Sequence, residues 1–504
     1  MAAIPTSVPI GVVGAGTMGA GIAEVAAAAG HRVLLYDGAA KAVEAALARI
    51  SAGLERAEGR GRLNTNQRAS TFARITACRE LEALAPAGLV IEAIAEDLGA
   101  KQQLFEELEA LVGPDAILAS NTSSLSITAL AAELQRPERL VGMHFFNPAP
   151  RMALVEVVRG LASAPETVAV ATATAEAWGK TAVEVRSTPG FIVNRVARPF
   201  YGEALRALAE RAADVATIDA LMREAGGFLI GPFELIDLIG LDVNLAVSRQ
   251  IHEAYHHDPR YTPSLIQREL VQAGRLGRKA GRGFYDYAEG APAHLPQTAP
   301  PAPPPKTILV EGELGIAEAL LPRFKASGIA IDRRSGEGLI RIGQLRLVRT
   351  DGRGATAWSY MLDRPVAAFD LALDYGSCKR LAIAPADQTS AQELQPAIGL
   401  LQAAGIEVSV LDDLPGLLVM RTVCMLANEA AEAVQAGVAS AAAIDTAMRL
   451  GVNYPRGPLE WAQTIGLKPV LEALDHLART YGEDRYRAAW LLRRKVMAKE
   501  KFLY

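Results

Sequence analysis

Short apolar runs alternate with amphipathic, Ala-rich stretches from the N-terminus to about position 185. Apolar runs at 10–14, 32–36, 89–94 and 116–120 have the length and composition of buried strands, and the segments between them have helical periodicity. Strands that alternate with helices are typical of a parallel, doubly wound sheet covered by helices. The pattern therefore predicts an α/β domain over residues 1–187.

The pattern changes after this region. Periodicity is helical up to about residue 274, with turn signals at Gly226-Gly227 and Gly231-Pro232, which predicts an all-helical domain over 188–288. Seven of the fourteen residues from 292 to 305 are proline. Because proline cannot enter a central strand or a helix interior, we expect 289–306 to be a semi-extended spacer between two halves of the chain.

The second half repeats the helical domain of the first. When the chain is aligned with itself so that Pro189 lies on Pro415, 19 of the 53 positions from 189 to 241 are identical without gaps. The segment 413–504 is therefore expected to be a second, non-catalytic helical domain that packs against the first copy. Strand-like runs between 307 and 412 match the first domain poorly, which predicts a degenerate sheet domain there.

Composition and charge narrow the class of protein. The chain has 52 basic and 56 acidic residues, with no long block of one sign, which argues against nucleic-acid and membrane partners. No apolar run reaches the roughly 18 residues of a membrane span. Three scattered cysteines suit a reducing compartment and have no metal-ligand spacing. We expect a cytoplasmic protein without a signal peptide and without a metal.

A glycine-rich turn directly follows the first predicted strand. The segment 14–19, GAGTMG, opens the next helix and contains Gly14, Gly16, Thr17, Met18 and Gly19. Such glycines let backbone N–H groups approach a pyrophosphate, and the helix N-terminus adds partial positive charge. An acid ends the second strand at the usual spacing of about 20 residues after the glycines, where a carboxylate binds ribose hydroxyls and repels a 2′-phosphate. This residue, Asp37, favours NAD over NADP.

A histidine stands at the end of a later strand. His144 precedes a proline-rich loop, and Glu156 lies in the next strand-like run, 154–158. Imidazole is a suitable base for removing a hydroxyl proton, and a carboxylate would orient it; a hydrogen-bonded core histidine is the alternative. The segment 120–124, SNTSS, offers hydroxyl groups at the carboxyl end of a strand, although one of them could simply cap a helix.

Taken together, these segments resemble those of a known enzyme family. In content and order, GAGTMG, SNTSS, HFFNPAP with LVEV, and STPGFIVNR resemble the 3-hydroxyacyl-CoA dehydrogenase family over residues 9–287, and the long form resembles its bacterial members that act on 3-hydroxyadipyl-CoA in phenylacetate catabolism. The resemblance implies NAD-dependent oxidation of an (S)-3-hydroxyacyl-CoA, with a Rossmann-type cofactor domain. It implies His144 as base, Glu156 as its partner, and Ser123 and Asn194 as hydrogen-bond donors to the reacting oxygens. It also places four further residues around NAD: Glu96, Lys101, Asn147 and Lys279.

Other positions bear on the substrate. Arg56, Arg60 and Arg62, expected to follow a long helix, could meet the CoA phosphates, although a solvated helix face is an equal alternative. Arg198 follows Asn194 by one helical turn and could bind a terminal carboxylate. The alternative is an arginine that is solvated or paired with an acid such as Glu203. The chain departs from the family at Ala153, where lysine is usual, and at Leu229-Ile230, where Pro-Met is usual, which could reshape the acyl pocket.

Three other functions are open from the sequence. A short-chain 3-hydroxybutyryl-CoA dehydrogenase would share every motif. A dehydrogenase of free β-hydroxyacids would carry a catalytic lysine on the helical domain, where this chain has Asn194. A non-catalytic NAD-binding sensor would lack the histidine–glutamate pair. The expected partner is an acyl-CoA substrate, and the duplication suggests either a homo-oligomer or a pseudo-dimer within one chain.

Overall fold

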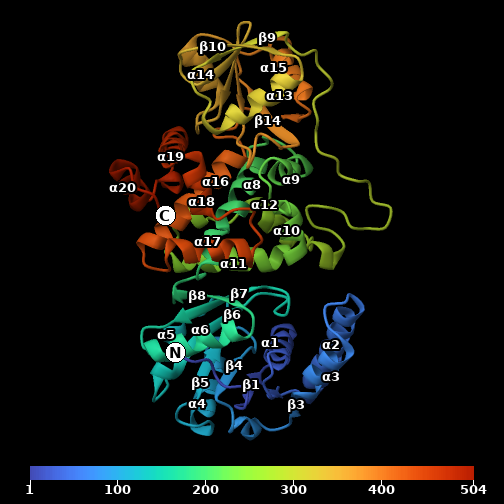
Figure 1. The fold of residues 1–504 in the computed structure, drawn as a ribbon, viewed down its shortest axis with the longest axis vertical. Coiled ribbons are helices and arrows are strands. Elements are labelled where there is room, and N and C mark those ends of the chain that lie inside the picture. Colours follow the sequence, from blue (N-terminus) through green and yellow to red (C-terminus); the bar gives the residue numbers. More distant parts are fainter. Residues whose placement is uncertain (504) are drawn as a thin grey trace. The chain divides into compact units, whose positions relative to one another are not determined.

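The computed structural model of the chain describes residues 1–503 and forms two compact units (Figure 1). The first unit contains residues 1–195 and 436–452, and the second contains 196–435 and the residues from 453 onward. A short helical segment from the second half therefore belongs to the same unit as the first sheet.

The first unit is built on an eight-stranded sheet with the order β3-β2-β1-β4-β5-β6-β7-β8. Its strands are β1 (Ile10–Val13), β2 (Val33–Tyr36), β3 (Ile75–Cys78), β4 (Leu89–Glu92), β5 (Ile117–Ser120), β6 (Leu140–Phe145), β7 (Leu154–Arg159) and β8 (Thr181–Arg186). The four strands expected from apolar runs are confirmed. All neighbouring strands are parallel except β6 and β7, so the expectation of a wholly parallel sheet was wrong at this one pair.

Helices cover this sheet and carry the glycine-rich turn. They are α1 (Thr17–Ala28), α2 (Ala40–Gly59), α3 (Thr65–Ala73), α4 (Leu98–Leu111), α5 (Ile127–Leu130), α6 (Pro165–Ala177), α7 (Val193–Val196) and α17 (Ala441–Gly451). The helices α2 and α3 form a pair beside α1 (Figure 1). Val43, Ala46, Ile50 and Leu54 recur at helical spacing and are buried, so α2 turns one apolar face inward and leaves its charged face outward.

The second unit contains both copies of the helical domain. Its helices in these copies are α8 (Arg198–Ala209), α9 (Val215–Glu224), α10 (Pro232–Ile239), α11 (Leu241–Ala254), α12 (Leu265–Gln272), α16 (Val419–Gln435), α18 (Pro458–Ile465), α19 (Leu467–Tyr481) and α20 (Trp490–Ala498). The helix α16 of the second copy contacts α8 of the first, which confirms that the copies pack together. The helix α17 instead packs on β7 and β8, which the sequence did not predict.

Buried ion pairs join the two copies in a reciprocal way. Glu203 of the first copy accepts hydrogen bonds from Arg421, Arg485 and Tyr486 of the second. Conversely, Glu429 of the second copy lies 3.6 Å from Arg260 and accepts a hydrogen bond from Tyr261 of the first. Glu203 and Glu429 occupy equivalent positions in the alignment of the two copies. The contact therefore has the pattern of a two-fold symmetric interface, realised inside one chain.

A second, seven-stranded sheet also belongs to this unit. Its strands are β9 (Thr307–Glu311), β10 (Ala330–Arg334), β11 (Leu339–Ile342), β12 (Leu345–Arg349), β13 (Val366–Phe369), β14 (Arg380–Pro385) and β15 (Glu407–Val410), in the order β10-β9-β11-β12-β13-β14-β15. Three helices accompany it: α13 (Leu321–Ala326), α14 (Ala355–Leu362) and α15 (Ala391–Ala403). Antiparallel pairs at β9–β11, β11–β12 and β13–β14 distinguish it from the first sheet.

The proline-rich segment that leads to β9 is docked on the second sheet through hydrogen bonds. The N–H of Ala299 donates to the carbonyl of Val408 on the edge strand β15, and the Ser409 hydroxyl donates to the carbonyl of Gln297. The Gln402 side chain also binds the carbonyls of Ala299 and Pro300. The expected semi-extended conformation is compatible with these contacts, and the hydrogen bonds along the sheet are an addition that the sequence did not predict.

Residues 1–503 contain neither a membrane-spanning helix nor a metal-binding cluster. Within that range, none of the helices combines the length and the apolar character that a membrane crossing needs. The same residues contain no cluster of histidine, cysteine, aspartate and glutamate side chains that could hold a metal ion.

Candidate active site

The histidine and the glutamate expected from the sequence lie side by side on neighbouring strands. His144 on β6 is directly opposite Glu156 on β7, and its Nδ1 is 2.7 Å from the Oε2 of Glu156. Both side chains are buried. Because a carboxylate only accepts hydrogen bonds, this contact places the proton on Nδ1 and leaves the lone pair on Nε2. The arrangement fits a general base that is oriented by an acid.

Glu156 also fixes the segment that carries Asn194. Its second oxygen, Oε1, accepts hydrogen bonds from the N–H groups of Ile192 and Val193, at 3.0 and 3.1 Å. These groups lie at the beginning of α7, where backbone donors have no partner within the helix. One buried carboxylate thus orients His144 and positions Asn194, which is the next residue along the helix. Because the side chain at this position of β7 must accept hydrogen bonds from His144 and from two backbone N–H groups, a carboxylate suits it.

The loop after β5 leaves one hydroxyl available. The hydroxyls of Thr122 and Ser124 both donate to Glu96 Oε1, at 2.5 and 2.8 Å. The hydroxyl of Ser123, in contrast, forms no hydrogen bond with any residue in the range 1–503 that the structure describes, although its backbone N–H also binds Glu96. Ser123 is therefore the residue of this loop whose side chain is free to bind a ligand.

The glycine-rich turn has the shape that a dinucleotide needs. Gly14 has a φ of +99°, and an added Cβ would lie 2.5 Å from the carbonyl oxygen of Ala93. At Gly19, a Cβ would lie 1.7 Å from the carbonyl oxygen of Gly14, so a larger residue would push the helix from the turn. A Cβ at Gly16 would meet nothing within 4 Å, so the space in front of the start of α1 is open. Tight backbone behind and open space in front fit a bound pyrophosphate.

Asp37 ties this turn to the end of β2. One oxygen accepts the N–H of Ala15 at 2.7 Å, and the other accepts the N–H of Ala39 at 2.9 Å. The carboxylate is thus held at the edge of the cofactor turn, where the sequence placed a ribose ligand.

Two of the residues expected around NAD form a buried ionic cluster. The Lys101 ammonium donates to Glu92 Oε1 at 2.6 Å and lies 3.2 Å from Glu96 Oε2. Lys101 is 1 % exposed, which the sequence did not indicate. Burial raises the pKa of Glu96, but hydrogen bonds from Thr122 and the charge of Lys101 outweigh this and lower it. Glu96 is therefore held ionised. Lys101 contributes to the site by holding the side chains of Glu92 and Glu96 in place.

The other two expected NAD residues lie in different units. Asn147 follows β6 and belongs to the first unit, next to a cis peptide bond with Pro148. Lys279 belongs to the second unit, where its ammonium lies 2.6 Å from Asp242 Oδ1. Their contacts with NAD stay predictions.

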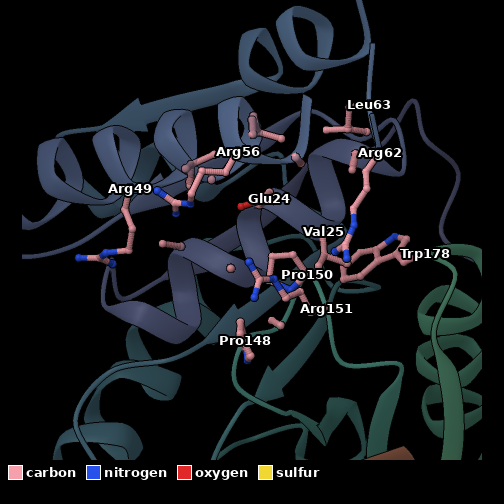
Figure 2. A pocket seen from close by; sticks show the side chains of 18 of the residues that line it. Glu24, Val25, Arg49, Arg56, Arg62, Leu63, Pro148, Pro150, Arg151 and Trp178 are labelled. Carbon is pink, nitrogen blue, oxygen red and sulfur yellow. The ribbon is translucent and has the colours of Figure 1, made fainter. Parts of the chain in front are cut away.

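A cavity of about 620 Å³ lies between α1, α2 and the loop after β6 (Figure 2). Arg56 and Arg60, which were expected to meet CoA phosphates, both line it, together with Arg62. The expectation that Arg56 follows the helix was wrong, because α2 continues to Gly59 and includes it in its last turn. All three arginine side chains are exposed, so a solvated face stays the alternative, and their contact with CoA phosphates stays a prediction.

Arg198 lines a second cavity, of about 430 Å³, in the second unit. Its side chain is buried, donates to the hydroxyl of Ser248 at 3.2 Å, and lies 4.8 Å from the ring centre of Tyr201. The expected alternative of a solvated surface arginine was wrong, because α8 turns this side chain inward. Burial lowers the pKa of Arg198 despite the opposing effect of Tyr201.

The second copy preserves part of the site. Asp370, at the end of β13, accepts hydrogen bonds from the N–H groups of Leu418, Val419 and Met420. Leu418 and Val419 are the counterparts of Ile192 and Val193 in the alignment of the two copies, so Asp370 stands where Glu156 stands in the first copy. Burial raises the pKa of Asp370 to about 6, although four backbone N–H groups oppose the rise.

Several residues of the site were missed from the sequence. Glu92, a member of the Lys101 cluster, was missed entirely, and Ser120 of the SNTSS segment donates its hydroxyl to Glu92 Oε2. Glu24 and Lys180 line the large cavity. Glu24 gave a signal that could have been used, because it is the only charged residue in the otherwise small and apolar helix α1.

Family comparisons cover nearly the whole chain. Residues 9–188 match the family model described as "3-hydroxyacyl-CoA dehydrogenase, NAD binding domain". Residues 190–287 and 416–501 both match "3-hydroxyacyl-CoA dehydrogenase, C-terminal domain", which supports the duplication. Residues 347–415 match "3-hydroxybutyryl-CoA dehydrogenase reduced Rossmann-fold domain".

Individual proteins show the same similarity. The chain is 45 % identical over 488 residues to the Escherichia coli protein named 3-hydroxyadipyl-CoA dehydrogenase, and the match covers 97 % of each. It is 46 % identical over 278 residues to a probable 3-hydroxybutyryl-CoA dehydrogenase of Bacillus subtilis, covering 55 % of this chain and 96 % of that one. A crystal structure described as 3-hydroxybutyryl-CoA dehydrogenase from Escherichia coli is similar with a TM-score of 0.90 and 44 % identity, covering 98 % of this chain and 99 % of that one.

Proposed function

The chain belongs to the 3-hydroxyacyl-CoA dehydrogenase family and is an NAD-dependent oxidoreductase, and from this premise we propose that it oxidises (S)-3-hydroxyadipyl-CoA to 3-oxoadipyl-CoA. The observation that carries the chemistry is the pair of buried side chains His144 and Glu156, joined at 2.7 Å. The name of the Escherichia coli relative that matches along 97 % of its length favours the dicarboxylic substrate.

In the proposed mechanism, His144 Nε2 takes the proton of the 3-hydroxyl group. Glu156 holds the imidazole through Nδ1 and stabilises the imidazolium that forms. The free hydroxyl of Ser123 and the amide of Asn194 hydrogen-bond the reacting oxygen. NAD, when bound at the glycine-rich turn, supplies the hydride acceptor. In the reverse direction, His144 returns the proton to the 3-oxo group.

The large cavity between α1 and α2 is proposed to hold the CoA moiety. Arg56, Arg60 and Arg62 line it and would neutralise the phosphates of the nucleotide. Two single alanine variants test this assignment. Arg56→Ala and Arg60→Ala should each raise the KM for an acyl-CoA at least several-fold and leave the affinity for NADH unchanged.

Arg198 is proposed to bind the terminal carboxylate of the dicarboxylic acyl chain. Its burial and its place on a cavity wall support this role, because a guanidinium removed from water gains most from an anionic ligand. A charged hydrogen bond of this kind contributes about 1.5–3 kcal/mol, or roughly 10- to 150-fold. Arg198→Met should therefore lower kcat/KM for 3-oxoadipyl-CoA by that factor and spare 3-oxohexanoyl-CoA. Equal losses on the two substrates would remove Arg198 from carboxylate recognition.

A second candidate substrate is 3-hydroxybutyryl-CoA. The description of the similar crystal structure names this substrate, as do several half-length relatives. A panel of acetoacetyl-CoA, 3-oxohexanoyl-CoA and 3-oxoadipyl-CoA, each reduced with NADH, discriminates between the candidates. The dicarboxylic proposal requires the highest kcat/KM for 3-oxoadipyl-CoA, and a preference for acetoacetyl-CoA would replace it with the short-chain one.

A further inference from the structure

The large cavity contains one acid among many bases. The residues from 1 to 503 that line it include a single carboxylate, that of Glu24 on α1. Figure 2 shows Glu24 between Arg56 and Arg151, on the side of α1 that faces α2. Six basic side chains line the same cavity: Arg49, Arg56, Arg60, Arg62, Arg151 and Lys180. An acid in this position is unexpected for a site that receives a phosphorylated ligand.

Glu24 is not used to neutralise these cations directly. It forms no hydrogen bond and no ion pair with any residue that the structure describes. The Lys180 ammonium instead donates to the carbonyls of Ala149 and Met152, at 2.7 and 2.9 Å. Nor is Glu24 needed to cap a helix, since it lies in the middle of α1. The side chain is thus half-buried, without a hydrogen-bond partner among the described residues, and part of the cavity wall.

The charge of the ligand decides how such an acid can bind. The nucleotide of CoA carries a pyrophosphate and a 3′-phosphate, so an ionised carboxylate in the same cavity would repel it. A protonated carboxyl group has no charge and can donate one hydrogen bond to a phosphate, carbonyl or hydroxyl oxygen. A neutral acid is therefore the form of Glu24 that is compatible with a bound CoA.

We propose that Glu24 contributes to recognition of the CoA moiety as a neutral carboxylic acid, so that acyl-CoA binding takes up a proton at this residue. The inference rests on the proposed function, which assigns the cavity to CoA. It makes Glu24 a determinant of substrate affinity at neutral and alkaline pH, separate from the His144–Glu156 pair.

The surroundings of Glu24 support a neutral form. Burial raises the pKa of Glu24 to about 7, although Arg56, Arg151 and Lys180 oppose the rise. The other charged groups that face the cavity are Arg49 in the middle of α2, Arg60 directly after its last residue, and Arg62, and all of them are cations. Since phosphates that enter would neutralise these cations, they would also remove the main force that keeps Glu24 ionised.

Calorimetric titration of the full-length protein with acetyl-CoA, which cannot be reduced at a 3-oxo group, tests the proposal. Glu24→Gln mimics the neutral acid at every pH. If only the protonated form of Glu24 binds, linkage with a pKa near 7 makes the variant bind about tenfold more tightly than the wild type at pH 8, about twofold at pH 7, and equally at pH 6. Titrations in two buffers of different ionisation enthalpy should also count more protons taken up by the wild type.

Two controls separate this effect from others. The phosphates of acetyl-CoA titrate identically in both proteins, so they cancel in the comparison. Glu44→Gln removes the same charge from an exposed position on α2 that does not line the cavity, and it should bind like the wild type at every pH. A gain in affinity in both variants would show a general effect of net charge and would overturn the proposal.

The remaining outcomes are also decisive. If wild-type protein does not bind acetyl-CoA, both the assignment of the cavity and this inference fail. If binding depends on Arg56 and Arg60 but Glu24→Gln follows the wild-type pH dependence, the cavity assignment stands and the role of Glu24 is refuted. If Glu24→Gln binds more weakly at all pH values, Glu24 accepts a hydrogen bond in its ionised form, which also contradicts the proposal.

Discussion

Replacing Glu156 with glutamine separates the two tasks of this carboxylate. In Glu156→Gln, the amide oxygen can still accept the N–H groups of Ile192 and Val193, so the start of α7 and the position of Asn194 should be kept. The amide NH₂ group then faces Nδ1 of His144, which must become an acceptor. The proton moves to Nε2, and the imidazole loses the lone pair with which it would take the substrate proton.

The expected magnitude follows from the loss of a positioned base. We expect kcat to fall by about 10²- to 10⁴-fold, the range for removing a general base or its correct tautomer. The affinity for NADH and the unfolding temperature should change little, because the isosteric side chain keeps both backbone contacts. The assay is the oxidation of NADH with 3-oxoadipyl-CoA or acetoacetyl-CoA, with NADH affinity followed by fluorescence.

The duplicate half supplies a matched control. Asp370 binds the equivalent backbone N–H groups, but Asp370→Asn should leave kcat unchanged within about twofold, because no histidine depends on it. It should lower the unfolding temperature, since the asparagine NH₂ group would face buried N–H donors. A loss of less than tenfold in kcat for Glu156→Gln, or an equal loss for Asp370→Asn, would refute the reasoning.

Three further predictions follow from other parts of the structure. Asp37→Ala should weaken NADH binding and narrow the preference over NADPH, as measured by the two dissociation constants; an unchanged ratio would exclude Asp37 from the ribose site. Glu203→Gln should destabilise the protein by roughly 3–5 kcal/mol at pH 7, because it removes the carboxylate that Arg485 and Arg421 share and leaves Arg421 only Glu210, 3.5 Å away. Burial raises the pKa of Glu203, but the charges of Arg485 and Arg421 outweigh this effect and lower the pKa from 4.5 to about 2. The contribution of Glu203 to the free energy of unfolding is therefore complete above pH 4.5 and is lost as the pH falls toward 2. Denaturant unfolding should show the free energies of the wild type and the variant becoming equal over this pH range. Calorimetry should find one NADH bound per full-length chain, because Glu311 at the end of β9 and Glu313 in the turn after it would repel a pyrophosphate, and two bound molecules would contradict this.

Burial decided which elements could be predicted. The strands β1, β2, β4 and β5 are fully or almost fully buried, so their apolar runs stand out from the sequence. The strand β3 is mostly exposed and was missed. The reversed direction of β7 could not be read either, because an apolar run has the same composition in parallel and antiparallel strands.

In the candidate site, too, some features could be predicted from the sequence and others could not. Motifs placed His144 and Glu156 in consecutive strands, but only the antiparallel register of β6 and β7 puts them opposite each other. The second task of Glu156, and its repetition by Asp370, depend on contacts between segments far apart in the chain. Glu24 was overlooked because an acid within a helix is usually solvated, and the cavity that surrounds it appears only when α2 packs beside α1.

The docked proline-rich segment has a consequence for how the chain avoids self-association. An edge strand such as β15 presents unpaired N–H and C=O groups that can recruit a strand from another molecule, which is a common origin of aggregation. Here the segment around Ala299 occupies part of that edge. Pro300 and Pro301 follow at once and have no N–H group to offer outward, so the covering segment is itself a poor template for another strand. Replacing these prolines with valine would keep the length of the connection and open a route to intermolecular β-pairing.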